Sequence, residues 1–235
     1  MKTLEFRSDT FTKPTPAMRR AMAEAEVGDD QYGEDPTVNR LEKRAAESVG
    51  KEAGLYVASG MMGNLCGVLS QTQRGDEVIL GDLAHIYQNE MDASFVLGGI
   101  VPHLVPNRDG LPSLDDIATA VRPQGMHART ALICLENSHN NCGGTVITAA
   151  QTNAIGDFAH QRGIRLHLDG ARISTPPRRS GSTRRRLPKA STPCSSASPR
   201  VSPHRSGRSS VATPRRSRRR GACANCSAAR CVKPA

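Results

Sequence analysis

Short apolar runs alternate with helical patterns over residues 1–173, and polar or glycine-rich residues follow most of these runs. The runs cover residues 54–58, 77–80, 100–105, 131–135 and 164–168. Their length is typical of strands, and their alternation with helices indicates a parallel sheet. Parallel strands end at one edge of a sheet, where open α/β folds bind their ligands. The pattern therefore predicts a doubly wound α/β domain with its site at that edge.

Capping residues predict where the first helices begin. Thr15-Pro16 and Asp35-Pro36 each pair an N-cap residue with a proline, which the first helical position tolerates. The second helix should end at Gly50, because glycine readily adopts the left-handed conformation that follows a helix. Its predicted buried face consists of Val38, Leu41, Ala45 and Val49.

Charge and aromatic content change abruptly after Ile173. All 22 acidic residues precede that point, together with 16 of the 32 Lys and Arg, so residues 1–173 carry a net charge of −6. Residues 174–235 carry +16 and contain no acidic or aromatic residue. A segment of that composition cannot bury enough apolar surface to offset its loss of conformational entropy. We therefore expect a partial domain at 1–173 and a disordered basic tail at 174–235.

The sequence shows no signal for a membrane or for a metal ion. No apolar run approaches the roughly 20 residues that span a bilayer, and the first residues lack the apolar core of a signal peptide. We expect a cytoplasmic protein without membrane contact. Cys223 and Cys226 form a single Cys-x-x-Cys pair, and without a second pair we expect no metal site.

Residues 167–173, His-Leu-Asp-Gly-Ala-Arg-Ile, carry the strongest chemical signal. Asp169 ends a predicted strand, where a carboxylate can hold a protonated ring nitrogen, and Arg172 can reach a carboxylate or a phenolate. Ser59-Gly60-Met61 opens a helix after a strand, which suits a phosphate. His85 can stack on a ring or move a proton. Taken singly, these signals also fit a helix cap, a surface arginine, a turn without a ligand and a packed histidine.

Six motifs taken together identify a family. They are Arg7-Ser8-Asp9-Thr10, residues 28–36 (Gly-Asp-Asp-Gln-Tyr-Gly-Glu-Asp-Pro), Ser59-Gly60 with Asn64, Ala84-His85, residues 135–140 (Leu-Glu-Asn-Ser-His-Asn) and residues 167–172. The set closely resembles the threonine aldolase family, whose members are pyridoxal-phosphate lyases of the aminotransferase-like fold, fold type I. The resemblance implies pyridoxal 5'-phosphate as the cofactor, a small β-hydroxy amino acid as the substrate and a homo-oligomer.

The resemblance assigns the cofactor contacts residue by residue. Asp169 would keep the pyridine nitrogen protonated, which makes the ring an electron sink. His85 would stack on the ring face, and Arg172 would reach its phenolate. The phosphate would be held by Ser59, Gly60 and Met61.

The substrate contacts follow from the same resemblance. Ser8 and Arg172 would bind the substrate carboxylate, and His139 would lie near the substrate hydroxyl. The hydroxyl proton would go to His85, to His139 or to a water between them. Cleavage would release an aldehyde and leave glycine.

The Schiff-base lysine of the family has no counterpart in this chain. It is expected about thirty residues beyond the aspartate in a Ser-Lys-Gly context. The only lysines after Asp169 are Lys189 and Lys233, and neither lies in that context. The resemblance also implies further strands, a small carboxyl-terminal domain and another arginine that the sequence lacks. We therefore expect a truncated and inactive lyase.

A shift of reading frame near Ile173 explains the tail. Codons exist for residues 197–207 that, read out of frame, spell Leu-Ser-Lys-Gly-Leu-Ser-Ala-Pro-Ile-Gly, the lysine motif of the family. In the same frame, residues 225–234 permit Leu-Leu-Gly-Gly-Ala-Met-Arg-Gln-Ala-Gly, which resembles another segment of these enzymes. We hypothesise that residues 174–235 are a frameshift product, caused by a sequencing error or by a pseudogene.

Two other functions fit parts of the sequence. Another pyridoxal-phosphate lyase, one that performs β-elimination, shares the fold, although residues 8–9 and 28–36 favour an aldolase. A non-enzymatic module would instead bind nucleic acid through the arginine-rich tail, notably residues 215–220. The tail has no aromatic side chains for stacking, so we expect only weak, nonspecific and salt-sensitive contact.

Overall fold

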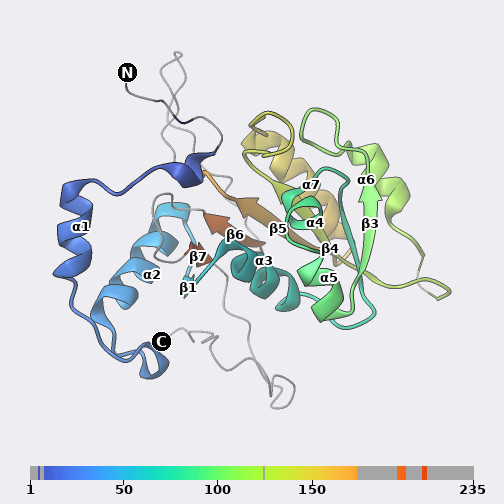
Figure 1. Ribbon diagram of the computed structural model, residues 1–235. Helices are drawn as coiled ribbons and strands as arrows, with labels where there is room; N and C mark the ends of the chain where they lie inside the picture. Colours follow the sequence, from blue (N-terminus) through green and yellow to red (C-terminus); the bar gives the residue numbers. More distant parts are fainter. Residues whose placement is uncertain (1–4, 6–7, 124, 174–194, 200–207, 211–235) are drawn as a thin grey trace.

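A five-stranded parallel sheet forms the centre of the computed structural model, which describes residues 5, 8–123, 125–173, 195–199 and 208–210 (Figure 1). The strand order is β3-β2-β4-β5-β6. The strands are β2 (Glu77–Gly81), β3 (Val101–Val105), β4 (Thr130–Glu136), β5 (Arg165–Gly170) and β6 (Ser195–Pro199). All four pairings between neighbours are parallel. The predicted α/β class is therefore confirmed.

Helices cover both faces of the sheet, because alternate strand residues point to opposite faces. Ile79 and Ile133 pack in one apolar cluster with residues of α6 (Leu114–Ala120) and α7 (Ala149–Gln161). Leu80 and Leu132 pack in the other cluster with residues of α3 (Gly60–Leu69) and α5 (Ala93–Gly98). This division is the doubly wound arrangement that the alternating pattern predicts.

The first predicted strand lies outside the central sheet. β1 (Leu55–Val57) pairs antiparallel with β7 (Arg208–Ser210) in a separate two-stranded sheet. Leu55 and Tyr56 are only half-buried, unlike the fully buried residues of β2. The inclusion of residues 54–58 in the main sheet was wrong, because an apolar run alone does not show whether both of its faces will be covered.

The basic tail contributes two short strands, β6 and β7, which its composition did not predict. Strands pair through backbone hydrogen bonds, which do not require particular side chains. Amino-acid composition describes only the side chains, so it did not indicate this pairing. The remaining tail residues, to which the expectations of disorder and of nucleic-acid contact apply, lie outside the described residues. Lys189 and Lys233 lie there as well.

The predicted helix caps are present in the amino-terminal part. Thr15 caps α1 (Pro16–Ala23), and Asp35 caps α2 (Pro36–Val49), which ends at Gly50 with a positive φ. Leu41 is 37% exposed, so the predicted buried face of α2 is wrong at this residue. Figure 1 shows α1 and α2 on the side of the molecule away from β3.

Short helical turns replace two segments without predicted structure. Residues 8–12 contain the 3-10 turn η1 (Asp9–Phe11). A second such turn, η2 (Asp30–Tyr32), precedes α2. The loop after β2 leads into α4 (His85–Gln88), so His85 opens a helix. None of the helices in the described residues is long and apolar enough to cross a membrane.

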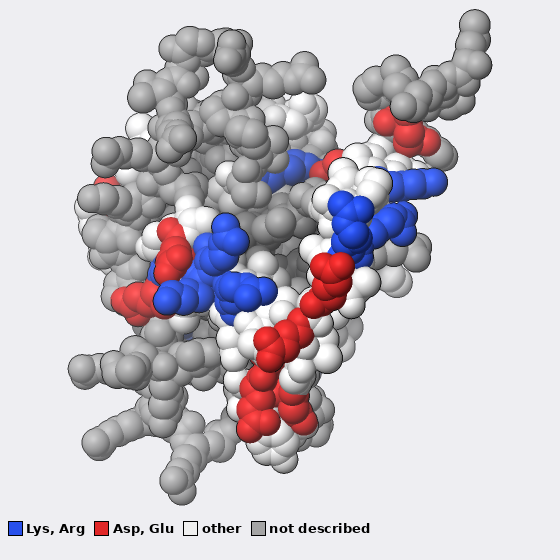
Figure 2. All heavy atoms as spheres, turned by 90° about the vertical axis from the view of Figure 1, so that its left-hand side faces the viewer, with Lys and Arg blue, Asp and Glu red and all other residues white. Residues whose placement is uncertain are grey.

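Acidic and basic side chains lie next to each other on the face that carries α1 and α2 (Figure 2). A duplex or single strand of nucleic acid requires a surface of mainly positive charge. The part of this face that the structure describes does not offer such a surface.

Candidate active site

Asp169 lies at the carboxyl end of β5, where the sequence predicted a ligand-binding carboxylate. It pairs in register with Glu136 at the end of β4, and both side chains are buried. Asn64 of α3 donates from Nδ2 to Asp169 Oδ2 at 3.0 Å. A buried carboxylate at this edge can accept a hydrogen bond from a protonated ring nitrogen.

Asn64 connects three buried side chains behind that carboxylate. Its Nδ2 also donates to Glu90 Oε1 at 2.8 Å, so one amide bridges Glu90 and Asp169. Its Oδ1 lies 3.2 Å from Nε2 of His167, which must therefore donate. Burial lowers the pKa of His167 and keeps its ring neutral, which is compatible with this single donation.

His85 is held by two glutamates, one nearby and one distant in the sequence. Its backbone N donates to Glu136 Oε2 at 2.7 Å. Its ring Nδ1 lies 2.9 Å from Oε1 of Glu90, a side chain that is only 1% exposed. A carboxylate oxygen accepts hydrogen bonds, so Nδ1 of His85 is the donor in this contact. The position of His85 therefore depends on a local contact with Glu90 and on a tertiary contact with Glu136.

One group of described residues has the donor types of a metal site. His85, Glu90 and Asp169 each offer a ligand atom, and these atoms lie within 4.8 Å of one another. Asn64 donates N–H groups to both of these carboxylates. The absence of a metal stays a prediction.

The predicted phosphate-binding turn opens α3. Ser59 is its N-cap, and the Ser59 hydroxyl accepts a hydrogen bond from the backbone N of Met62 at 3.1 Å. Gly60 is buried and has no side chain, so the backbone amides of the first turn are accessible to a close ligand. The N-terminus of a helix carries partial positive charge, which favours a phosphate. Met61 contributes an amide rather than a hydroxyl.

Arg172 joins the end of β5 to the amino-terminal segment. Its Nε and Nη2 lie 3.2 Å and 3.3 Å from the two carboxylate oxygens of Asp9. Ser8 is adjacent to Asp9 and contacts its carboxylate, and Arg172 also donates to Asn140 Oδ1 at 3.4 Å. Ser8 and Arg172 thus both contact Asp9, which lies between them.

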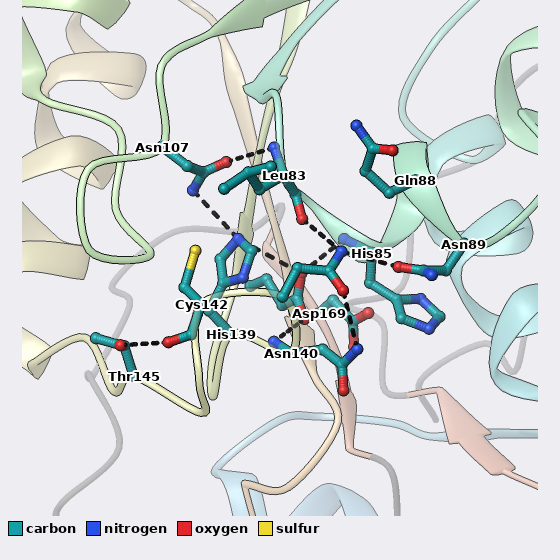
Figure 3. A network of polar contacts seen from close by, with 12 residues as sticks. Leu83, His85, Gln88, Asn89, Asn107, His139, Asn140, Cys142, Thr145 and Asp169 are labelled. Atoms are coloured by element: carbon teal, nitrogen blue, oxygen red, sulfur yellow. Dashed lines mark hydrogen bonds and ion pairs between the residues drawn. The ribbon is translucent and has the colours of Figure 1, made fainter. Parts of the chain in front are cut away.

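His139 is fully enclosed at the other side of the site (Figure 3). Its Nε2 lies 3.2 Å from Asn107 Nδ2 and 3.7 Å from Glu136 Oε2. Its backbone N donates to Thr145 O at 2.8 Å. His139 and His85 are thus both adjacent to Glu136, one through its ring and one through its backbone.

Comparison with known proteins decides the family. The profile of the beta-eliminating lyase family matches residues 5–187. The chain belongs to the beta-eliminating lyase family.

Several relatives of this family are threonine aldolases. The chain is 47% identical over 178 residues to low-specificity L-threonine aldolase 1 of Arabidopsis thaliana, a match that covers 74% of this chain and 50% of the relative. It is 44% identical over 172 residues to low specificity L-threonine aldolase of Escherichia coli K12, covering 72% and 51%. The chain spans about half the length of these curated relatives.

A solved structure supports the fold. The threonine aldolase of Leishmania major superposes with a TM-score of 0.68 at 20% identity, covering 87% of this chain and 61% of that one. The fold is that of the fold type I enzymes, and members of the beta-eliminating lyase family depend on pyridoxal phosphate.

The residues present fit that cofactor. A buried carboxylate, Asp169, suits a pyridinium nitrogen, and the open first turn of α3 suits a phosphate. Asp169 and the first turn of α3 are linked, because α3 also carries Asn64, which donates a hydrogen bond to Asp169. The described residues are therefore compatible with the non-covalent contacts of that cofactor.

Sequence reasoning missed two residues of the site, Glu90 and Asn107. Glu90 lies five residues after His85 and has no local pattern to mark it as buried. Asn107 lies in the stretch Asn107-Arg108-Asp109-Gly110, whose residue types are common in turns. An asparagine at this position therefore did not by itself indicate a site. Asn64 and Glu136 were part of the quoted motifs, but no role could be assigned to them from spacing alone.

Proposed function

We propose that this chain derives from a pyridoxal-phosphate-dependent lyase of the threonine aldolase type, which cleaves a β-hydroxy amino acid such as threonine into glycine and an aldehyde. The observation that carries the proposal is the convergence of Asp169, His85 and the first turn of α3 at one edge of the sheet. The match to the beta-eliminating lyase family and the identity to threonine aldolases support it.

Each residue near the edge has a role in this reaction. When bound, pyridoxal phosphate supplies an electron sink for the electron pair of the breaking Cα–Cβ bond. Asp169 would accept a hydrogen bond from the pyridine nitrogen, and residues 59–61 would bind the phosphate. Ser8 and Arg172 would bind the substrate carboxylate, in exchange for the contact that Arg172 makes with Asp9.

We infer that the missing lysine results from a shift of reading frame. The support is in the sequence: two segments of the tail, at 197–207 and 225–234, permit family motifs in one shifted frame and in the family order. Resequencing the gene across the codons for Arg172 to Pro177 tests this directly. One additional base, restoring a Ser-Lys-Gly lysine, would show an intact lyase.

Unchanged bases would leave this chain without a lysine to bond the cofactor. We then expect the purified protein to bind pyridoxal phosphate without the absorbance of a covalently bound cofactor and to cleave no threonine. An Asp169→Ala variant should bind the cofactor more weakly. Equal affinity for both proteins, measured by quenching of cofactor fluorescence, would contradict the proposed site.

A β-eliminating lyase is the second candidate, because the family description itself names that reaction. The two reactions give different products from threonine. An aldolase releases an aldehyde and glycine, whereas elimination of water releases ammonia and a 2-oxo acid. Product analysis with the frame-restored protein distinguishes them.

We also propose self-association, as the family resemblance implies. Large apolar side chains are exposed around α1 and η2, and exposed apolar surface of this kind favours contact with a partner. They are Phe11, Met22, Val27 and Tyr32. Sedimentation of the purified chain as a monomer at all concentrations would contradict self-association.

A further inference from the structure

Two hydrogen bonds hold the side chain of Asn107 in one orientation (Figure 3), and a third holds its backbone. Its backbone N donates to Asp82 Oδ1 at 2.8 Å. Its Oδ1 lies 3.1 Å from the backbone N of Leu83, and its Nδ2 lies 3.2 Å from Nε2 of His139. A Cβ atom on Gly81 would overlap the Asn107 amide, so the glycine is what allows this close approach.

The contact with Leu83 decides which end of the amide faces His139. A backbone N–H is only a donor, so the atom that faces Leu83 must be the amide oxygen. The amide NH2 must therefore face His139. The orientation of asparagine amides is assigned from their partners, and here the backbone partner leaves no alternative.

The orientation of Asn107 then decides the tautomer of His139. The NH2 group is only a donor, so Nε2 of His139 must accept with its lone pair. In a neutral imidazole the remaining hydrogen is then on Nδ1. Glu136 does not reverse this, because its Oε2 lies 3.7 Å from Nε2, too far for a hydrogen bond. The Glu136 oxygens instead accept from the backbone N atoms of His85 and Asn140, both at 2.7 Å.

Nδ1 of His139 has no hydrogen-bond partner among the described residues, although it is buried. A buried donor normally has a partner, so a ligand is the natural acceptor. The other ring nitrogen, Nε2, already accepts from Asn107. His139 therefore offers a ligand a donor and not an acceptor.

We propose that Asn107 is a positioning residue that fixes His139 as a hydrogen-bond donor and so excludes it as the acceptor of the hydroxyl proton. The inference rests on the proposed function. The β-hydroxyl proton passes to His85 or to a water, and the electrons of the O–H bond form the carbonyl. The electron pair of the Cα–Cβ bond remains on Cα. Throughout this step, Nδ1–H of His139 donates to the hydroxyl oxygen.

Nitrogen NMR of the full chain labelled with 15N-histidine tests the tautomer without any turnover. A protonated and an unprotonated ring nitrogen give well-separated signals, and the His139 pair is assigned by its loss in His139→Gln. In the parent protein we expect Nδ1 of His139 to be protonated and Nε2 to be unprotonated. The opposite pattern would overturn the proposal.

Asn107→Asp is the decisive variant, because it keeps the acceptor for Leu83 and replaces the NH2 donor by an oxygen. We expect Nε2 of His139 to become protonated in this variant. Asn141→Asp is the matched control, since Asn141 donates to Leu83 O and to Asn89 but not to His139. The control should leave the His139 signals unchanged. An equal change in both variants would mean that added charge, and not the lost donor, moves the proton.

A ligand titration separates the role of His139 from the proposed function. With pyridoxal phosphate present, L-threonine should shift the Nδ1 signal of His139, whereas glycine, which has no hydroxyl, should not. Equal shifts with both amino acids would overturn the role of His139 in the reaction. Absence of any binding would overturn the proposed function, while the tautomer result would still decide what Asn107 does.

Discussion

Asn64 is the residue that links the buried carboxylates at the site. It is 1% exposed and donates to both Glu90 and Asp169, while His167 donates to its oxygen. Two buried carboxylates close to each other repel, and the bridging amide offsets part of that repulsion. The stability of the site therefore depends on a residue that touches neither cofactor phosphate nor substrate in the proposed reaction.

Asn64→Ala should lower the free energy of unfolding by about 2–4 kcal/mol, because it leaves buried charged groups without their donor. Urea unfolding followed by circular dichroism measures the loss. Asn141→Ala is the control, since Asn141 is exposed and its loss should cost no more than about 1 kcal/mol. Similar losses for the two variants would show that the bridge contributes little.

His167 makes stability depend on pH. Burial lowers its pKa below the ordinary value of 6.5, so below about pH 6.5 the unfolded chain binds a proton there that the folded chain does not. The stabilising contribution is thus fully present above pH 6.5 and is lost as the pH falls toward the folded-state pKa. We expect the unfolding free energy of His167→Gln, measured in urea, to fall less between about pH 7 and about pH 5 than that of the parent protein.

The exposed His127 provides the control for that pH series. His127→Gln should leave the pH dependence of stability as it is in the parent protein. A parent protein whose unfolding free energy did not fall across this range would show that His167 is not kept neutral by folding.

At the scale of elements, the site depends on how the end of β2 meets the loop after β3. Gly81 ends β2 and pairs with Val105 of β3, and Asn107 follows two residues later. The Asn107 amide occupies the space that a Gly81 side chain would need. The two segments therefore approach closely only because residue 81 has no Cβ.

Gly81→Ala should lower the free energy of unfolding by about 1–3 kcal/mol and displace Asn107, because the added methyl overlaps a group that is hydrogen-bonded on both sides. Gly156→Ala is the matched control. Gly156 lies inside α7, where the new methyl would meet only Leu166 at 3.6 Å, and alanine should stabilise the helix by up to about 1 kcal/mol. Thermal unfolding of the two variants should therefore shift in opposite directions, and a common direction would contradict the packing argument.

At the scale of the whole molecule, Arg172 contacts Asp9, which lies 163 positions earlier in the sequence. Its pairing with Asp9 holds the amino-terminal segment against the end of β5. Both side chains are partly exposed, so the pair should contribute only about 0.2–1 kcal/mol to folding. Its main consequence is the placement of Ser8 beside the proposed substrate site.

A double-mutant cycle with Asp9→Asn and Arg172→Gln should measure a coupling of this size in unfolding experiments at low salt. The coupling should shrink in high salt, because solvent ions screen a partly exposed pair. A coupling that is unaffected by salt would show that the contact is more enclosed than the structure indicates.

The sequence by itself determined the strands β2 to β5, the caps of α1 and α2, and the polar residues at strand ends. These features depend on local rules, because periodicity and capping involve residues within a few positions of each other. Asp169, His85 and Ser59 could be named on that basis. The burial of Leu41 and the place of β1 were predicted wrongly, since both depend on which distant surfaces cover them.

Only the tertiary structure decided how the candidate site is held together. The contact between Asn64 and Asp169 spans 105 residues, and the burial of Glu90 has no local signal. The tautomer of His139 follows from an amide whose orientation is set by the backbone of Leu83. Such contacts depend on the register of parallel strands and the packing of helices on them, and no spacing within a single segment encodes either.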